Sequence, residues 1–130
     1  MKKITLMIAL LFIWGASFSQ NFNKVYSSVY SSYEYGTWVT KQTYYPKDMY
    51  LTIDGYDIRI NNNDESHYKT YGSSQKTTYS THDCFTWSCI DKKGVSCIFM
   101  MKKFYESGTY ILSFVYLKQG DMYEYVIENQ

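Results

Sequence analysis

Short runs of alternating apolar and polar residues, separated by turn residues, constrain the fold of this chain more than any other feature. The clearest runs are residues 49–53 and 56–60, on either side of Asp54-Gly55. Asp-Gly between two such runs favours a two-residue β-hairpin turn. Strands paired about this turn share one apolar face, made of Met49, Leu51, Ile53, Tyr56, Ile58 and Ile60. A slip of one residue would expose that face, so the burial pattern determines the register.

The same pattern continues to the C-terminus. Asp91-Lys92-Lys93-Gly94 suits a type I turn between two strongly apolar strands. A last turn centred on Gln119-Gly120 sets Tyr116 opposite Tyr123, Phe114 opposite Tyr125 and Leu112 opposite Ile127. The predicted strands beyond the first hairpin are residues 67–71 and 76–81, which are polar and expected at an edge, then 85–90, 95–104, 109–117 and 122–128.

Consecutive hairpins joined by short turns predict an all-β fold, an antiparallel meander forming a single domain over residues 36–130. The meander is either an open, curled sheet or a lipocalin-like small barrel, and closure would remove exposed edges. Residues 20–35 form either a short N-terminal helix or an extended lead-in. Their apolar residues follow helical spacing, but their Val, Tyr and Ser content disfavours a helix.

The first nineteen residues have the order of a signal peptide. Lys2 and Lys3 precede an apolar run over residues 4–14, and small or polar residues follow up to Ser19. We therefore expect a leader over residues 1–19, cleavage before Gln20, and export to the periplasm, the outer surface or the medium. The apolar run is too short to span a bilayer comfortably, so no membrane span is expected after cleavage.

Charge and composition narrow the choice of partners. Loss of Lys2 and Lys3 changes the formal net charge from +1 to about −1, which gives no electrostatic reason to bind nucleic acid. The chain has sixteen tyrosines, none of them in the leader. Tyrosine suits half-buried strands, and together with Ser and Asn it also forms adaptable recognition surfaces.

The three cysteines raise the question of pairing. Counting outward from the Asp91 turn sets Cys89 opposite Cys97, within the reach of a disulfide, and this is the predicted bond. A bond from Cys84 to either of them, or three buried free thiols, are the alternatives.

No motif for a cofactor or a metal stands out. His82 and Cys84 share a strand face and could serve a hydrolase or thiol enzyme, but no flanking motif accompanies them. His67, His82, Asp83 and Cys84 lack the paired spacing of a zinc site. Residues 61–65 resemble a calcium loop in composition only. We therefore expect no catalytic residue, no metal and no cofactor.

The segment Trp87-Ser88-Cys89-Ile90-Asp91-Lys92-Lys93-Gly94-Val95-Ser96-Cys97, with Tyr110 to Tyr116 and Tyr123-Glu124-Tyr125, is similar to a pattern in small uncharacterised secreted β-rich proteins of Bacteroidota. The lysine-rich start and the Ser-Gln cleavage region also resemble leaders of that group. The resemblance covers the C-terminal third and the leader. It implies export and a β-rich fold, and it implies no activity.

The leading functional hypothesis is an exported, non-catalytic binding module that uses a Tyr-rich sheet face or barrel mouth. Its partner is an unknown small molecule, glycan or protein. The alternatives are the enzyme built around His82 and Cys84, and a structural envelope protein without a small ligand. The candidate ligand-binding residues are Tyr110, Phe114, Tyr116, Tyr123 and Tyr125.

Overall fold

A computed structural model of the chain describes residues 22–61 and 66–127, and within these ranges it has nine β-strands and no helix. The predicted leader lies outside them. The strands are β1 (Phe22–Glu34), β2 (Thr37–Tyr44), β3 (Tyr50–Asp54), β4 (Asp57–Asn61), β5 (Ser66–Thr78), β6 (His82–Asp91), β7 (Ser96–Phe104), β8 (Tyr110–Tyr116) and β9 (Asp121–Ile127).

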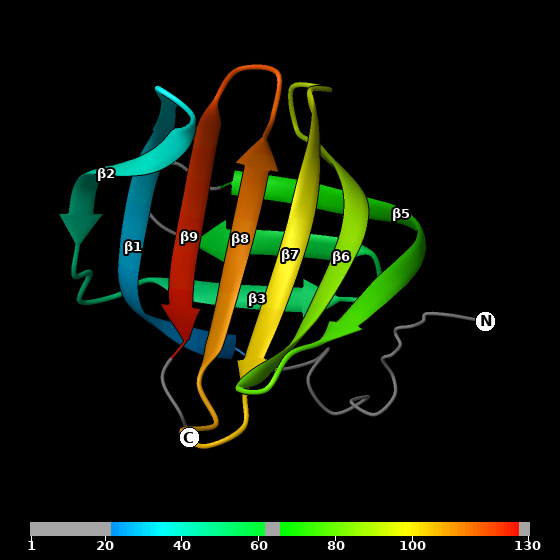
Figure 1. Cartoon of the computed structure of the whole chain (residues 1–130). Coiled ribbons are helices and arrows are strands. Elements are labelled where there is room, and N and C mark those ends of the chain that lie inside the picture. The colour runs from blue at the N-terminus through cyan, green and yellow to red at the C-terminus, as the bar shows by residue number, and fades with distance from the viewer. Residues whose placement is uncertain (1–21, 62–65, 128–130) are drawn as a thin grey trace.

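The sheet closes on itself. Neighbouring strands pair antiparallel in chain order from β3 to β9, and β1 pairs with both β3 and β9. Eight of the strands in the described part therefore form a closed barrel, and β2 lies outside it, paired to the second half of β1. Figure 1 shows β1, β9, β8, β7 and β6 as the near layer, with β3 and β5 running across behind it. The predicted all-β, lipocalin-like small barrel is confirmed.

The segment before residue 36 is extended, as one of the two predicted alternatives has it, and not a helix: it forms β1 and closes the barrel. Val25 lies in the core, completely buried. A bulge between Val25 and Ser27 breaks the alternation of side chains, so apolar residues fall on both faces of the strand. Val29 and Tyr30, beyond the bulge, also lie on opposite faces, so apolar residues on both faces of β1 account for the spacing that imitates a helix. The described sheet thus begins at Phe22, before the predicted start of the β domain at residue 36.

The first predicted hairpin is confirmed, with its turn moved by one residue. Ile53 pairs with Ile58 and Leu51 with Ile60, so the loop is Gly55-Tyr56 and not Asp54-Gly55. Gly55 has a φ of +62°, which suits the first position of a type II′ turn. The register therefore differs from the predicted one by two residues, which keeps the same apolar face but moves Tyr56 into the exposed turn.

The last hairpin shows the same kind of shift. Phe114 pairs with Tyr123 and Leu112 with Tyr125, whereas the sequence predicted Tyr125 and Ile127 as their partners. The cause is a four-residue turn, in which the Gly120 N–H donates to the Tyr116 carbonyl at 2.8 Å. The predicted partners are diagonal neighbours instead, and the rings of Phe114 and Tyr125 meet edge to face at 6.1 Å.

The two polar strands predicted at an edge are one bulged strand, β5, which lies between β4 and β6. Its register shifts between Tyr71 and Gln75, around the Gly72 that the sequence suggested as a break. Only its first half pairs with β4, through residues 66–69. The second half pairs with β6 alone and bends away from the barrel (Figure 1).

Aromatic rings fill the middle of the barrel. The Tyr68 and Phe114 rings stack at 3.8 Å between centroids, and Phe99 lies 5.1 Å from Phe114 and 5.3 Å from Trp87. Phe114 itself is fully buried. Stacking at these distances leaves no room for a ligand among these rings.

Candidate functional site

The predicted ligand-binding residues all belong to strands β8 and β9 and point toward the barrel interior. Phe114, Tyr116 and Tyr125 are buried in the core, while Tyr110 and Tyr123 are half-buried. The predicted stripe of side chains on one face of β8 and β9 therefore exists, but most of its rings are buried against other aromatic rings. Its role in binding stays a prediction.

A polar network closes one end of the barrel around Asp91, at the turn between β6 and β7. One carboxylate oxygen accepts hydrogen bonds from the Lys93 and Val95 N–H groups at 2.9 Å, and the other accepts one from the Tyr116 hydroxyl at 2.8 Å. Partial burial opposes ionisation of this carboxyl, but the hydrogen bonds outweigh it and hold the pKa of Asp91 below its ordinary value. Asp91 therefore joins the turn to the core as an anion.

Cys89 and Cys97 are directly opposite each other, as predicted, but the predicted disulfide is not present. Both are buried free thiols, and so is Cys84. The Asp91 N–H donates to the Val95 carbonyl, and the alternation of an antiparallel ladder then makes Cys89–Cys97 a hydrogen-bonded pair. Side chains are farther apart in such pairs than in the intervening ones. The hydrogen bond to Cys97 and burial raise the pKa of the Cys89 thiol.

His82 and Cys84 do not form a catalytic pair in the structure. The His82 ring lies between Tyr79 and Phe104, with centroids 4.7 Å from each, and its Nδ1 is 2.9 Å from the Thr81 hydroxyl. Cys84 is buried, and burial raises the pKa of its thiol. A buried, protonated thiol is a poor nucleophile, so this geometry gives the enzyme hypothesis no support.

Within residues 22–61 and 66–127, no three His, Cys, Asp or Glu side chains gather closely enough to hold a metal ion. His67 instead contacts Asp57, with Nε2 and Oδ1 3.1 Å apart. Most of the calcium-like segment, residues 62–65, lies outside the described residues. No helix in the described part is long and apolar enough to cross a membrane.

The buried tyrosines predict alkaline unfolding. Burial raises the pKa of Tyr125 to about 12 and also raises that of Tyr68. The unfolded chain loses these protons near pH 10, so stability is full below about pH 10 and falls above it. The expected loss is about 1.4 kcal/mol per pH unit for each such group, until the pH passes the folded pKa. Urea unfolding between pH 8 and pH 12 measures this slope. Tyr125→Phe should make the slope shallower, and an unchanged slope would contradict the assignment.

The largest group of exposed aromatic side chains lies on the β1–β2 hairpin and the residue after it, which sequence reasoning missed. Tyr26 and Tyr45 meet edge to face at 5.7 Å, and Tyr33 and Trp38 at 5.2 Å. We name this part of the hairpin, with aromatic side chains on both of its faces, the tyrosine arm, made of Tyr26, Tyr33, Tyr35, Trp38, Tyr44 and Tyr45; its tyrosines are each at least half exposed. The available signal was the number of aromatic residues on both sides of Gly36, with Tyr33 and Tyr35 before it and Trp38, Tyr44 and Tyr45 after it.

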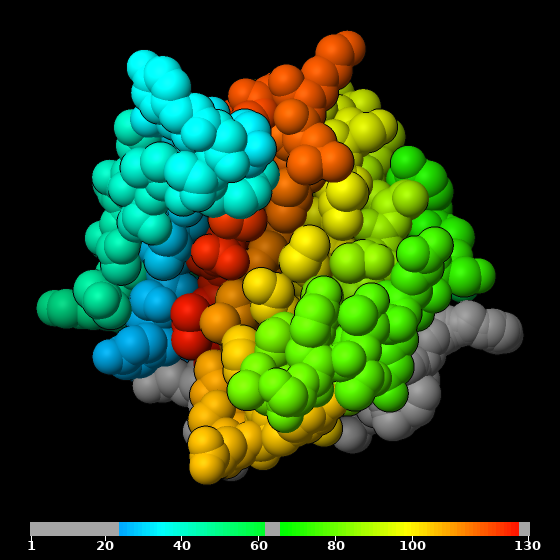
Figure 2. Space-filling model, viewed as in Figure 1, coloured from blue at the N-terminus to red at the C-terminus, as the bar shows by residue number. Residues whose placement is uncertain are grey.

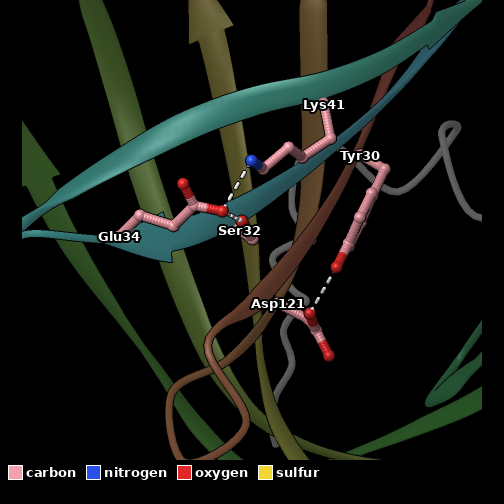
Figure 3. A network of polar contacts seen from close by, with 5 residues as sticks. All are labelled: Tyr30, Ser32, Glu34, Lys41 and Asp121. Atoms are coloured by element: carbon pink, nitrogen blue, oxygen red, sulfur yellow. Dashed lines mark hydrogen bonds and ion pairs between the residues drawn. The ribbon is translucent and has the colours of Figure 1, made fainter.

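A set of polar contacts, drawn in Figure 3, holds the arm in place. The Tyr30 hydroxyl donates to Asp121 of β9 at 2.7 Å, and this hydrogen bond raises the pKa of Tyr30 to about 12. Glu34 accepts a hydrogen bond from Ser32 at 2.7 Å and contacts the Lys41 ammonium at 2.6 Å. The contact with Lys41 lowers the pKa of Glu34, so the charges on the arm neutralise each other.

Comparison of this chain with protein-family models, with curated proteins and with solved structures finds no match. Its function therefore has to follow from the described residues. In these residues, stacked aromatic rings occupy the middle of the barrel. What their geometry does offer is a neutral, aromatic outer surface on the arm.

Proposed function

We propose that this protein is an exported, non-catalytic binding module, and that the tyrosine arm is its contact surface. The leader-like N-terminus and the resemblance to secreted proteins of Bacteroidota support export. The arm supports the binding role, because it gathers aromatic side chains where the fold does not bury them.

Tyr35 is the observation that carries the proposal. It stands at the tip of the arm with a φ of +52°, and no other residue except glycine has a positive φ in the described ranges. The left-handed conformation costs a side-chain-bearing residue about 1–2 kcal/mol. The Tyr35 side chain is fully exposed, at 103 %, so packing does not offset that strain. The two-residue turn between Glu34 and Thr37 requires a positive φ at this position but does not require an aromatic ring, and contact with a partner would account for the ring.

The chemistry of the arm fits a glycan or a protein partner. Tyrosine rings supply rigid contact area, and the serine and threonine hydroxyls between them supply adaptable hydrogen bonds. The one ion pair, between Glu34 and Lys41, is internal to the arm. The partner surface should therefore be uncharged where it meets the arm.

The variant Tyr35→Asn should separate folding from binding. Asparagine tolerates the left-handed conformation, so we expect the free energy of unfolding to rise by about 1 kcal/mol. Binding should weaken, because the exposed ring is lost. Urea unfolding measures the first effect. Retention on immobilised polysaccharides and on immobilised cell-envelope proteins measures the second.

The matched control is Tyr56→Ser, which removes an exposed tyrosine from the β3–β4 turn, outside the arm. It should leave retention unchanged. The proposal would be wrong if Tyr35→Asn and the unaltered protein were retained equally on every immobilised partner that binds the unaltered protein. The arm would then not be the contact surface.

A further inference from the structure

A second surface lies on the outer face of the barrel, where the alternate side chains of β8 and β9 point away from the core. Register places six of them side by side in three pairs: Val115 with Met122, Ser113 with Glu124, and Ile111 with Val126. Ile98 and Met100 of β7 extend the first two pairs. We name the six paired residues of β8 and β9 the outer trough.

The outer trough is recessed, and solvent reaches it through the half-buried Ile111, Met122, Glu124 and Val126. Val115 is 5 % exposed and Ser113 is 1 % exposed, values that belong to a core and not to an outward-facing position. Figure 2 gives the reason, because β9, β8 and β7 lie deep between the β1–β2 hairpin and the β5–β6 connection, which both project toward the viewer. The outward face of these strands is therefore the floor of a hollow.

Glu124 places a single carboxylate in the middle of this apolar floor. Ser113 donates a hydrogen bond to it at 3.2 Å, and among the described residues no cation pairs with it. A positive group that reached this half-buried carboxylate would form a charge-assisted contact with it. The trough is thus complementary to one cation flanked by apolar groups.

The spacing of the trough fits an extended polypeptide. Along β9 the order is Met122, Glu124, Val126, and along β8 it is Val115, Ser113, Ile111. Successive positions lie about 6.8 Å apart, which is the two-residue repeat of any extended strand. A strand lying in the trough would present side chains i, i+2 and i+4 to an apolar, an acidic and again an apolar position.

We propose that the outer trough binds an extended segment of a partner protein with an apolar residue, then Lys or Arg two positions on, then a second apolar residue two positions further. The cation pairs with Glu124, and the apolar side chains lie against the Val115–Met122 and Ile111–Val126 pairs. This binding does not rest on the role of the tyrosine arm.

The test uses a fluorescent peptide, Thr-Val-Thr-Lys-Thr-Val-Thr, and a second peptide with Glu in place of Lys, each titrated with the purified protein and followed by anisotropy. The lysine peptide should bind at least about tenfold tighter than the glutamate peptide. Glu124→Gln should lose about tenfold in affinity for the lysine peptide. Glu124→Lys should reverse the preference between the two peptides.

Two controls keep the result specific. Glu106→Gln alters a carboxylate in the exposed β7–β8 turn and should leave peptide affinity unchanged. Tyr35→Asn should also leave it unchanged, so failure of the arm and failure of the trough are distinguishable. Thermal unfolding confirms that each variant is folded.

Several outcomes would overturn the proposal. Equal affinity for both peptides, or an unaltered affinity in Glu124→Gln, would remove the role of the carboxylate. Competition by butylamine at the same concentration as the peptide would indicate a small amine as the ligand. Sedimentation of the protein as a dimer that Glu124→Gln dissociates would identify a second copy as the occupant of the trough.

Discussion

Replacing Phe114 with alanine is expected to lower the free energy of unfolding by about 4 kcal/mol. Phe114 is fully buried, and it contacts three other rings, those of Tyr68, Phe99 and Tyr125. Its removal leaves a cavity bounded by strands on opposite sides of the barrel. A closed sheet cannot easily collapse into such a cavity, so the cost should lie toward the upper end of the range for such substitutions.

Urea or thermal unfolding followed by tryptophan fluorescence, to which the buried Trp87 contributes, measures this loss. Phe114→Leu keeps most of the volume and should cost less than half as much. Tyr71→Ala, which removes an exposed ring from β5, is the matched surface control and should change stability by less than about 1 kcal/mol. A loss below about 2 kcal/mol for Phe114→Ala would mean that the ring cluster is not the centre of the core.

Asp91→Ala should be the second most damaging substitution, with a loss of about 3 kcal/mol. It removes the acceptor of two backbone N–H groups in the β6–β7 turn and leaves the buried Tyr116 hydroxyl without this partner. Hydrogen bonds to a charged group contribute about 1.5–3 kcal/mol each in favourable cases, and an unsatisfied buried hydroxyl adds to the loss. Equilibrium urea unfolding at neutral pH measures this loss in the free energy of unfolding.

The double variant Asp91→Ala with Tyr116→Phe separates these contributions. If the hydroxyl and the carboxylate stabilise the fold together, the second substitution should cost little once the first is made. The lowered pKa of Asp91 gives a further check, since this stabilisation is present above its ordinary pKa and is lost as the pH falls through the folded value. Full additivity of the two substitutions would show that the hydrogen bond contributes nothing.

The sequence was sufficient to predict the antiparallel hairpins, because their alternation and turn residues are local. The Asp91 turn and the Cys89–Cys97 register followed from counting alone, and the structure confirms both. For the β3–β4 and β8–β9 turns, the predicted register was wrong by two residues. A shift of two leaves the same side chains facing the core, so the burial pattern cannot detect it, and only the conformations of Gly55 and Gly120 decide it.

Closure and the two proposed contact surfaces were harder to foresee, because they depend on residues far apart in the chain. β1 joins the barrel through pairing with β9, a contact that no local pattern reveals. The predicted tyrosine and phenylalanine stripe on β8 and β9 was correct as a face, but neighbouring strands bury most of it. The recess around Glu124 arises from the bending of β5 and of the β1–β2 hairpin, which sequence periodicity does not describe.

The contact between β1 and β9 has a consequence for how the protein is made. Val25 pairs with Ile127, about a hundred residues later, so the ring of strands cannot close until β9 has been synthesised. Until then both terminal strands offer unpaired backbone groups to any neighbour. Long-range pairing of this kind slows folding, and the incomplete chain is therefore the form most exposed to aggregation and proteolysis.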